Sequence, residues 1–428
     1  MNKHILLVIL LLILKTSFAQ DIVKIMQYNL LYYGENTSYC TYVNNNITNK
    51  NEYLKKIIDD IKPDIFTVNE ITANDLTIED LMNNCLNVSG RNWYSKAGFT
   101  NWAGSNIVNM LYYDNRKFTL YAQDVIEFNS LRDINVYHLY YNSPDITSLL
   151  DTAYLTCIVA HLKAGSTQSD EDTRNEMAQA IMQFIDNQNK ETNYLLMGDF
   201  NTYSASESAM QTFVNYIDAT YHFNDPINQL GDWNNNYSYS NYHTQSTHTT
   251  SGCAAGGGMD DRFDLILISN YVKNGTDKIQ YHQNSYIAFG QDGLRLNQTI
   301  NSPANTVVST DIADALYGMS DHLPVIIELD IDQTPALGIN SNKLFNFNIN
   351  FNNPVASILN ISIEVEQNTN TSLMIYSLTG KMLMKKELYL ISGCNNIHFD
   401  INSLSSGMYY LVLKNEKDFI TYKKLMKI

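Results

Sequence analysis

The sequence lacks features that define several common classes of protein. It has only five cysteines in 428 residues, none in C-x-x-C spacing, which argues against a zinc site. The 28 basic residues against 44 acidic ones give a formal net charge of −16, with no basic block. A nucleic-acid coat protein would need such a positive surface. An enzyme that meets phosphate through a divalent cation is not excluded, because the metal supplies the positive charge.

Long apolar runs are also absent after the first twenty residues. Residues 1–19 have the pattern of a signal peptide: Lys3 and His4 start it, an apolar run follows over residues 5–14, and small residues end it. Ten apolar residues are too few to span a bilayer. The sequence therefore predicts an exported soluble protein with no stable membrane span.

Export permits disulfide bonds, and the cysteines are scattered. Cys40 with Cys85 is one pairing that the sequence allows, and the odd total leaves at least one free thiol. Cys157 lies in a strand-like run, which predicts a buried, unreactive thiol.

Hydrophobic residues make up 44 % of the chain, which is ample for a packed core. Between residues 22 and 331 apolar runs alternate with amphipathic stretches. Eight runs have the pattern of strands: residues 22–31, 64–71, 106–113, 136–141, 154–162, 194–200, 263–269 and 324–331. Helical spacing occurs at residues 54–61 and 177–185, the second with Asp172 or Thr173 as a candidate N-cap. Many strands and few helices predict an α/β domain of packed sheets with helices outside, over residues 20–332.

One long polar insertion, residues 228–258, has no apolar period. Loops of this length are usually functional, so we expect it at the mouth of a site. Contact with substrate is one interpretation of its His243 and His248, and the favoured one is that they are solvated loop histidines.

The C-terminal part of the chain has a different pattern. Residues 333–355 are Asn-rich and contain Pro335 and Pro354, which predicts a linker. Residues 356–428 then form a predicted small all-β sandwich without a catalytic cluster. Its strands are expected at residues 358–366, 372–377, 397–401, 408–414 and 419–423.

Polar side chains stand at the ends of six predicted strands, where they are costly unless they have a role. They are Asn29, Glu70, His161, Asp199 with Asn201, Asp264 after Arg262, and Asp321 with His322. A single strand-end Asn or Asp is more often a turn former, and a single histidine is more often part of a core. The conjunction of six indicates a common site.

Two pieces are the most specific: Gly-Asp-Phe-Asn at residues 198–201 and Ser-Asp-His-Leu-Pro at residues 320–324. With the other strand ends, in the same order, residues 22–331 resemble the endonuclease/exonuclease/phosphatase superfamily of deoxyribonuclease I-like enzymes. The resemblance implies a four-layer α/β sandwich and Mg²⁺-dependent hydrolysis of a phosphate ester, with Mn²⁺ or Ca²⁺ as alternatives. The superfamily includes nucleases, inositol phosphatases and sphingomyelinases, so the substrate does not follow.

The resemblance also implies roles for individual residues. Glu70 matches the metal ligand, with Asn29 and Asp321 close to the same ion, since carboxylate and amide oxygens suit Mg²⁺. His322 and Asp199 match the groups that activate or position the attacking water.

Asp264 matches the carboxylate that pairs with His322, although Asp260 and Asp261 could compete for that role. Asn201 and His161 should donate hydrogen bonds to phosphoryl oxygens, and His161 could also protonate the leaving oxygen.

Arg132 resembles a phosphate-contacting arginine of some members, although a surface ion pair explains it equally well. Lys163 and Arg262 are further candidates for substrate binding. The partner of His161 is open between Asn106 and Asn109.

The C-terminal module has a resemblance of its own. Residues 373–381, 401–409 and 423–428 are similar to segments of Bacteroidetes type IX secretion sorting domains. This resemblance implies contact with the secretion machinery, passage across an outer membrane, and then release or surface attachment. A β-sandwich that contacts carbohydrate or protein is the alternative.

Together these features predict a secreted metal-dependent phosphodiesterase, foremost an extracellular nuclease with nucleic acid as substrate. A sphingomyelinase-like phospholipid phosphodiesterase and a phosphomonoesterase are the enzymatic alternatives. A non-catalytic binding protein on the same scaffold is the alternative from another class.

Overall fold

The structure, a computed structural model, describes residues 20–128, 131–143, 152–333, 348–365, 368–377, 381–415 and 420–428. The chain divides into two compact units, residues 1–335 and 336–428. The predicted signal peptide and most of the predicted linker lie outside the described residues. In the described part of the chain, no helix is both long and apolar enough to cross a membrane.

The larger unit is built on two β-sheets. One has the strand order β11-β13-β1-β2-β4-β3, with β12 also paired to β13, and the other has the order β5-β6-β7-β8-β10-β9. The strands of the first sheet are β1 (Gln20–Tyr33), β2 (Ile65–Thr72), β3 (Tyr94–Lys96), β4 (Ile107–Asp114), β11 (Ile279–Tyr281), β12 (Ile287–Ala288) and β13 (Val325–Asp332). Those of the second are β5 (Phe118–Ile126), β6 (Ile134–Tyr141), β7 (Tyr154–His161), β8 (Tyr194–Asp199), β9 (Phe223–Asn224) and β10 (Asp264–Ser269).

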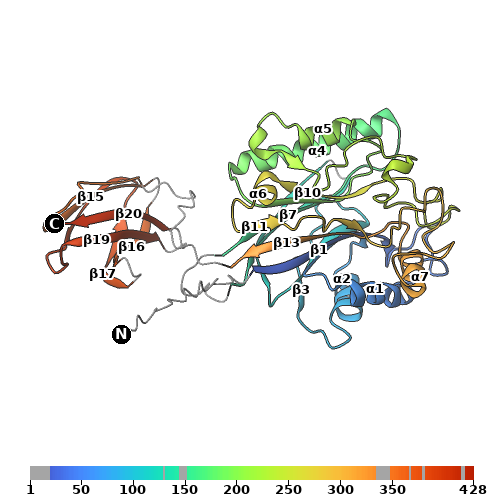
Figure 1. Ribbon diagram of the computed structural model, residues 1–428, viewed down its shortest axis with the longest axis horizontal. Helices are drawn as coiled ribbons and strands as arrows, with labels where there is room; N and C mark the ends of the chain where they lie inside the picture. Colours follow the sequence, from blue (N-terminus) through green and yellow to red (C-terminus); the bar gives the residue numbers. More distant parts are fainter. Residues whose placement is uncertain are drawn as a thin grey trace, which may run out of the picture. The chain divides into compact units, whose positions relative to one another are not determined.

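Helices cover the outer faces of both sheets (Figure 1). The first sheet carries α1 (Ile47–Ile61), α2 (Asp75–Leu81) and α7 (Thr310–Met319), and the second carries α4 (Gln168–Gln188) and α5 (Ser208–Val214). Shorter helices are α6 (Asn270–Asn274), η1 (Met82–Leu86), η2 (Ala219–Tyr221) and η3 (Tyr237–Tyr239). One apolar core lies between the sheets and under α1, α2 and α7, and a second lies under α4 and α5. The predicted four-layer α/β sandwich is confirmed.

Sequence patterns located the buried elements better than the exposed ones. All eight strands predicted for this unit are present. The edge strand β5 was not predicted, because its middle residues are exposed and it shows no clear alternation. The predicted N-cap of α4 is wrong: Thr167 caps the helix in a capping box with Asp170. The first turn of α4 is polar, so the apolar period does not reveal it.

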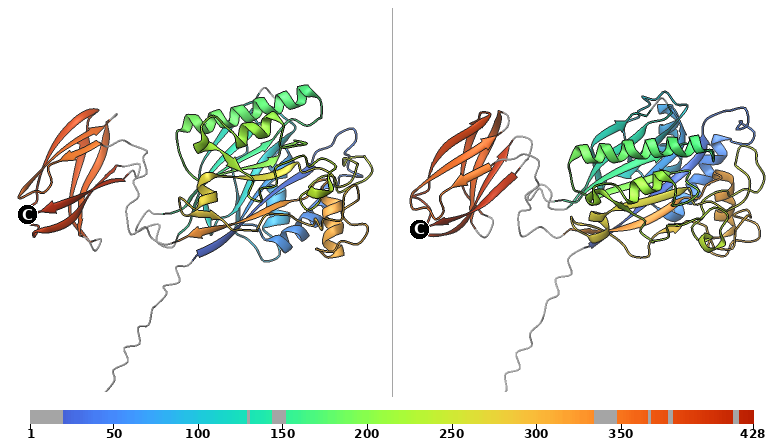
Figure 2. Two further views of the ribbon diagram at one scale, coloured as in Figure 1. Left: turned by 45° about the horizontal axis from the view of Figure 1, so that its top comes forward. Right: turned by 90° about the horizontal axis from the view of Figure 1, so that it is seen from above.

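The smaller unit consists of two antiparallel sheets, in the orders β14-β15-β18 and β17-β16-β19-β20 (Figure 2). Their strands are β14 (Asn348–Phe351), β15 (Ile358–Val365), β16 (Thr369–Ser377), β17 (Met382–Leu390), β18 (Gly393–Asp400), β19 (Gly407–Asn415) and β20 (Ile420–Lys427). Apolar side chains from both sheets form one core, which confirms the predicted all-β unit. β14 lies within the predicted linker and was not predicted as a strand. Its Asn-rich composition hid the alternation of polar and apolar residues that buries Ile349.

The cysteine pairing differs from the one that the sequence suggested. Cys40 forms a disulfide with Cys253, 213 residues away, and not with Cys85. Cys85 is a buried free thiol near the Tyr33 hydroxyl. Cys157 is buried as predicted, and burial raises the pKa of its thiol.

Candidate active site

A cavity of about 340 Å³ opens where the carboxyl ends of β1, β2, β7 and β8 meet. We call it the strand-end pocket. Six of the eight predicted catalytic and metal-binding side chains line it: Glu70, His161, Asp199, Asn201, Asp321 and His322. The other two, Asn29 and Asp264, lie directly behind this lining and are hydrogen-bonded to it.

Strand register explains why residues so far apart in sequence meet. β7 and β8 are parallel with His161 opposite Asp199, and β10 pairs with β8 so that Asp264 is also opposite Asp199. In the other sheet β1 and β2 are parallel, and Asn29 lies opposite Asn69. Parallel strands place their carboxyl ends at one edge, which gathers these side chains.

Asn29 joins the two sheets at this edge. Its Nδ2 donates to Glu70 Oε1 (3.1 Å) and to Asp199 Oδ2 (2.9 Å). Burial and the charge of Asp321 raise the pKa of Glu70, while the charges of His322 and Arg132 oppose this shift. Burial raises the pKa of Asp199 to about 7. The site therefore concentrates carboxylates that are largely buried, where an unneutralised charge is costly.

The backbone is unusual at Glu70 and directly before Asp199. Glu70 has φ 59°, at a register shift between Val68 and Ile71 of β2. A non-glycine residue in the left-handed region is strained, and such strain clusters at functional sites. At Gly198 a Cβ would lie 1.7 Å from the carbonyl oxygen of Ala160, so only glycine fits before Asp199.

His322 is held between two polar side chains. Its Nδ1 lies 2.6 Å from Asp264 Oδ2, and its Nε2 lies 2.6 Å from Gln245 Nε2 and 3.7 Å from Asp199 Oδ2. Burial would lower the pKa of His322, but the charges of Asp264 and Asp199 raise it well above its ordinary value. The carboxylate that pairs with Nδ1 of His322 is thus Asp264, as the sequence predicted. Asp261, one of the competing candidates, instead accepts a hydrogen bond from Asn234 Nδ2.

His161 is buried and faces the carboxylates of the pocket. Its Nε2 lies 3.5 Å from Asp199 Oδ2 and 3.7 Å from Glu70 Oε1. Burial and the charge of Arg132 lower the pKa of His161 well below its ordinary value, which keeps the ring neutral at pH 7. A neutral ring suits a hydrogen-bond donor or a metal ligand better than a general acid. Asn109, one of the two candidate partners of His161, instead has its side chain hydrogen-bonded to Asn69 and Asn135.

The residues present fit a divalent cation. Ligand atoms of Glu70, His161 and Asp199 all lie within 4.8 Å of one another. Asp321 Oδ1 is buried and has no hydrogen-bond partner among the described residues. Oxygen donors of this kind suit Mg²⁺, Mn²⁺ or Ca²⁺. The geometric cluster contains His161 and Asp199 beside Glu70, whereas the sequence had grouped Asn29 and Asp321 with Glu70.

Sequence reasoning missed a buried polar hub behind the pocket. Asn69 Oδ1 accepts from Gln27 Nε2 (2.7 Å) and from the Asp199 amide (2.9 Å), and its Nδ2 donates to Asn109 Oδ1 (2.7 Å). Buried amides with several partners fix the positions of the groups that they contact. The sequence does contain a signal for this hub, because polar residues such as Thr67 interrupt otherwise apolar strands.

Gln245 was also missed, although the insertion that carries it was correctly expected at the mouth of the site. Gln245 and residues 251–255 line the strand-end pocket. The interpretation of the loop histidines was wrong for His243, which is buried with its Nε2 2.7 Å from the carbonyl oxygen of Trp233. His248 is partly buried and stacks on Tyr317.

The three candidate cations differ in their surroundings. Arg262 is buried in an ion pair with Asp225 (2.8 Å), and Lys163 pairs with Asp170 (2.8 Å); neither lines the pocket. The Nε and Nη1 atoms of Arg132 are buried without a hydrogen-bond partner in the described ranges. Arg132 does not line the pocket either, but its charge acts on Glu70 and Asp199, so of these three cations it is the one whose charge reaches the site.

Residues 351–427 match the family model described as a secretion system C-terminal sorting domain. The predicted resemblance of this module is thus confirmed, and it implies export with release or attachment at the cell surface. No curated protein matches the chain significantly.

Solved structures similar to the chain include endonuclease/exonuclease/phosphatase family proteins. One from Bacteroides thetaiotaomicron is 14% identical; the match covers 74% of this chain and 97% of that chain, with a TM-score of 0.46. One from Bacteroides vulgatus is 13% identical over 73% of this chain and 99% of that chain, with a TM-score of 0.47. D. rerio TDP2 in complex with a single-stranded DNA product is 12% identical over 72% and 98%, with a TM-score of 0.45.

Proposed function

We propose that the protein is an exported, divalent-metal-dependent phosphoesterase that hydrolyses phosphodiester bonds in extracellular nucleic acid. The observation that carries this proposal is the cluster of Glu70, His161 and Asp199 ligand atoms in one pocket with His322, whose partner Asp264 lies directly behind the pocket lining. Hydrolysis of a phosphodiester requires a cation near its oxygens and an oriented water. The carboxylates and histidines of this pocket are the residue types that suit both requirements, which supports the proposal.

Glu70 would hold the cation, with Asn29, His161, Asp199 and Asp321 around it. A bound divalent cation supplies positive charge for the phosphoryl oxygens. Asn201 and His161 donate hydrogen bonds to the same oxygens, and Arg132, whose Nε and Nη1 have no partner among the described residues, adds a charge-assisted donor.

His322 and Asp199 handle the proton of the attacking water. As the water oxygen bonds to phosphorus and the ester P–O bond breaks, the water proton passes to this pair and then to the leaving oxygen. Asp264 orients the His322 ring through Nδ1, so that Nε2 faces the pocket. Asp264 is thus a positioning residue that acts through His322.

The predicted export supports nucleic acid as the substrate class. An exported enzyme meets nucleic acid outside the cell, whereas inositol phosphates are cytosolic. The chain has a net charge of −16, so we expect substrate binding to depend on the metal site and Arg132 rather than on a broad basic surface.

The test uses the full chain from Gln20 onward with Mg²⁺. We would compare kcat/KM on duplex DNA, RNA, sphingomyelin and a phosphomonoester, each with and without EDTA. Chelator-sensitive cleavage of nucleic acid well above the other substrates supports the proposal. A preference for the lipid or the monoester overturns the substrate, and no hydrolysis of any of the four overturns the enzymatic function.

A phospholipid phosphodiesterase is a second candidate, and one observation favours it. The loop between β1 and α1 exposes Tyr39 (49 %), Tyr42 (70 %) and Val43 (90 %), and Tyr39 also lines the pocket. Exposed aromatic and apolar side chains beside a pocket are typical of contact with a membrane surface. Loss of sphingomyelin hydrolysis, but not of DNA cleavage, in Tyr42→Ser/Val43→Ser would support this candidate.

A further inference from the structure

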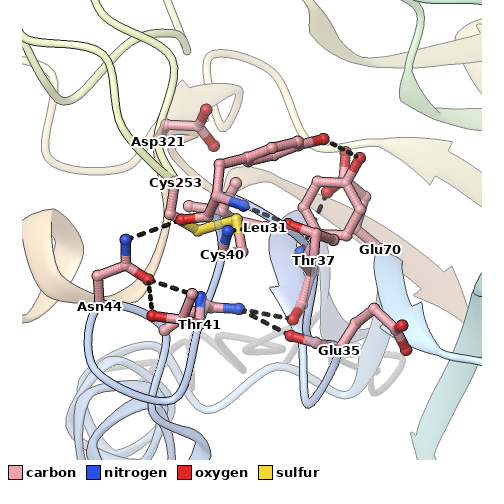
Figure 3. Close-up of a disulfide and its surroundings, with 12 residues drawn as sticks. Leu31, Glu35, Thr37, Cys40, Thr41, Asn44, Glu70, Cys253 and Asp321 are labelled. Carbon is pink, nitrogen blue, oxygen red and sulfur yellow. Dashed lines mark hydrogen bonds between the residues drawn. A yellow bond between two sulfur atoms is a disulfide. The ribbon is translucent and has the colours of Figure 1, made fainter.

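The Cys40–Cys253 disulfide is part of the wall of the strand-end pocket. Cys253 lines the pocket together with Glu70, Asp321 and His322. Figure 3 shows the disulfide beside Asp321, with Glu70 on the far side of Leu31. The bond joins the loop before α1 to the polar insertion, which are otherwise remote in sequence.

The two halves of the disulfide are held very differently. Cys40 is fully buried, its amide donates to Thr37 Oγ1 (2.8 Å), and its carbonyl oxygen accepts from the Thr37 amide (2.7 Å). By contrast, none of the side chains of residues 249–257 is buried, and most are Thr, Ser, Ala or Gly. Cys40 is therefore the fixed anchor, and residues 249–257 form the segment that it holds.

Few other contacts hold this segment. Ser246 Oγ donates to the Ala255 carbonyl oxygen (2.6 Å), and the Gly257 amide donates to the Thr249 carbonyl oxygen (3.3 Å). A segment with exposed hydrogen bonds and no apolar burial opens at low cost in free energy. The disulfide is thus the main restraint that keeps residues 249–257 against the pocket.

The segment makes one contact with the acidic cluster. The Ala255 amide, two residues after Cys253, donates to Asp321 Oδ2 (2.8 Å). The other oxygen, Oδ1, is left without a partner in the described part of the chain and lies 3.9 Å from His322 Nε2. The amide therefore fixes the rotation of the carboxylate and directs its free oxygen.

We propose that the Cys40–Cys253 disulfide positions Asp321 through the Ala255 amide and completes the pocket wall, so that full catalytic competence requires the oxidised protein. This inference rests on the proposed function. Disulfides persist in exported proteins and are reduced in the cytoplasm. The chain is therefore held at low activity until export, when a protein disulfide oxidant accepts two electrons from the two thiols, which release two protons as the S–S bond forms.

The test separates positioning from general stabilisation. In Cys40→Ala/Cys253→Ala, measured well below its melting temperature, we expect kcat to fall about 10–100-fold, as is usual when a group that orients an active-site ligand is lost. Dithiothreitol should lower the wild-type kcat to the same level. Cys394→Ser, which removes the exposed thiol of the C-terminal unit, is the matched control and should behave as wild type.

Whether the losses in kcat are additive distinguishes positioning of Asp321 from a purely structural role of the disulfide. If the disulfide acts through Asp321, its removal should cost little more in an Asp321→Asn background. Hydrogen exchange of the Ala255 amide, measured without metal or substrate, should accelerate strongly in the cysteine double mutant. A wild-type kcat in the double mutant, full additivity with Asp321→Asn, or unchanged exchange at Ala255 would overturn the inference. Absence of any phosphoesterase activity would instead overturn the proposed function, and exchange would still test the positioning.

Discussion

Asp264 Oδ2 and His322 Nδ1 lie 2.6 Å apart, although the two residues are 58 positions apart in sequence. Asp264 is the first residue of β10, and His322 follows shortly after α7. A carboxylate can only accept, so the proton on Nδ1 faces Asp264. The ring is thereby oriented with Nε2 toward Asp199, at 3.7 Å.

The pair should behave as one unit. We expect Asp264→Asn to lower kcat about 10²–10⁴-fold, the usual contribution of a positioned acid–base group. Because Asp264 acts through His322, the double variant Asp264→Asn/His322→Ala should be no slower than His322→Ala alone. Steady-state kinetics on folded proteins, checked by circular dichroism, measure this. Additive losses in the double variant would contradict the pairing.

Glu70 is expected to dominate metal binding. In Glu70→Gln, which keeps the shape and removes the charge, Mg²⁺ should no longer raise the melting temperature. For the wild type, Mg²⁺ at 100 times its Kd should stabilise the fold by about 2.7 kcal/mol. Differential scanning fluorimetry with and without EDTA gives the readout, with the exposed Glu176→Gln of α4 as control. An undiminished Mg²⁺ response in Glu70→Gln would sink the assignment.

Arg132 should act in binding the phosphate. Loss of a charge-assisted hydrogen bond costs about 1.5–3 kcal/mol, so Arg132→Met should lower kcat/KM about 10–100-fold. Arg116→Met is the matched control, because that guanidinium is exposed and paired with Asp114. Equal kinetics of Arg132→Met and wild type would leave Arg132 without a role in catalysis.

Asn69 should contribute to both stability and activity. Asn69→Ala removes the partner that Asn69 gives to Gln27 Nε2, Asn109 Oδ1 and the Asp199 amide, which should lower the free energy of unfolding by about 2–4 kcal/mol. Because Asp199 loses a restraint, kcat should fall as well. Urea unfolding measures the first effect, and Asn187→Ala on the exposed face of α4 should change it by less than about 0.5 kcal/mol. A near-neutral Asn69→Ala would contradict the hub.

The buried side chain of Lys50 should make the stability of the fold depend on pH. Its Nζ donates to the carbonyl oxygens of Leu30 and Leu31, and burial lowers its pKa to about 7 from 10.5. Between these values the unfolded chain binds a proton that the folded chain lacks, so raising the pH through this window should stabilise the fold. The gain relative to Lys50→Met should be about 1.4 kcal/mol per pH unit. Urea unfolding at pH 7.5 and 9.5 tests it; a pH-independent difference would show that Lys50 stays charged.

Much of the architecture could be predicted because the signals are local. A buried strand shows its apolar run, and α1 shows its period at Leu54, Ile57, Ile58 and Ile61, all of which are buried. Exposed or edge elements such as β5 lack that signal. The strand ends carrying Glu70, His161 and Asp199 were also visible in the sequence, because a polar side chain after an apolar run is itself a local anomaly.

Relations between distant residues could not be predicted in this way. Nothing near Cys40 indicates Cys253 rather than Cys85, since the pairing depends on how two loops meet. The same holds for the cations: Arg262 and Lys163 are as basic as Arg132, but folding places them beside Asp225 and Asp170.

The sequence alone therefore determined the two-part organisation, the sheet elements and the set of chemical groups at the strand ends, because each follows from the order of neighbouring residues. Only the tertiary structure decided which of the other distant groups touch: Gln245 on Nε2 of His322, and Cys253 on Cys40. The physical reason is that hydrogen bonds and disulfides act over a few ångströms, and chain folding sets those distances.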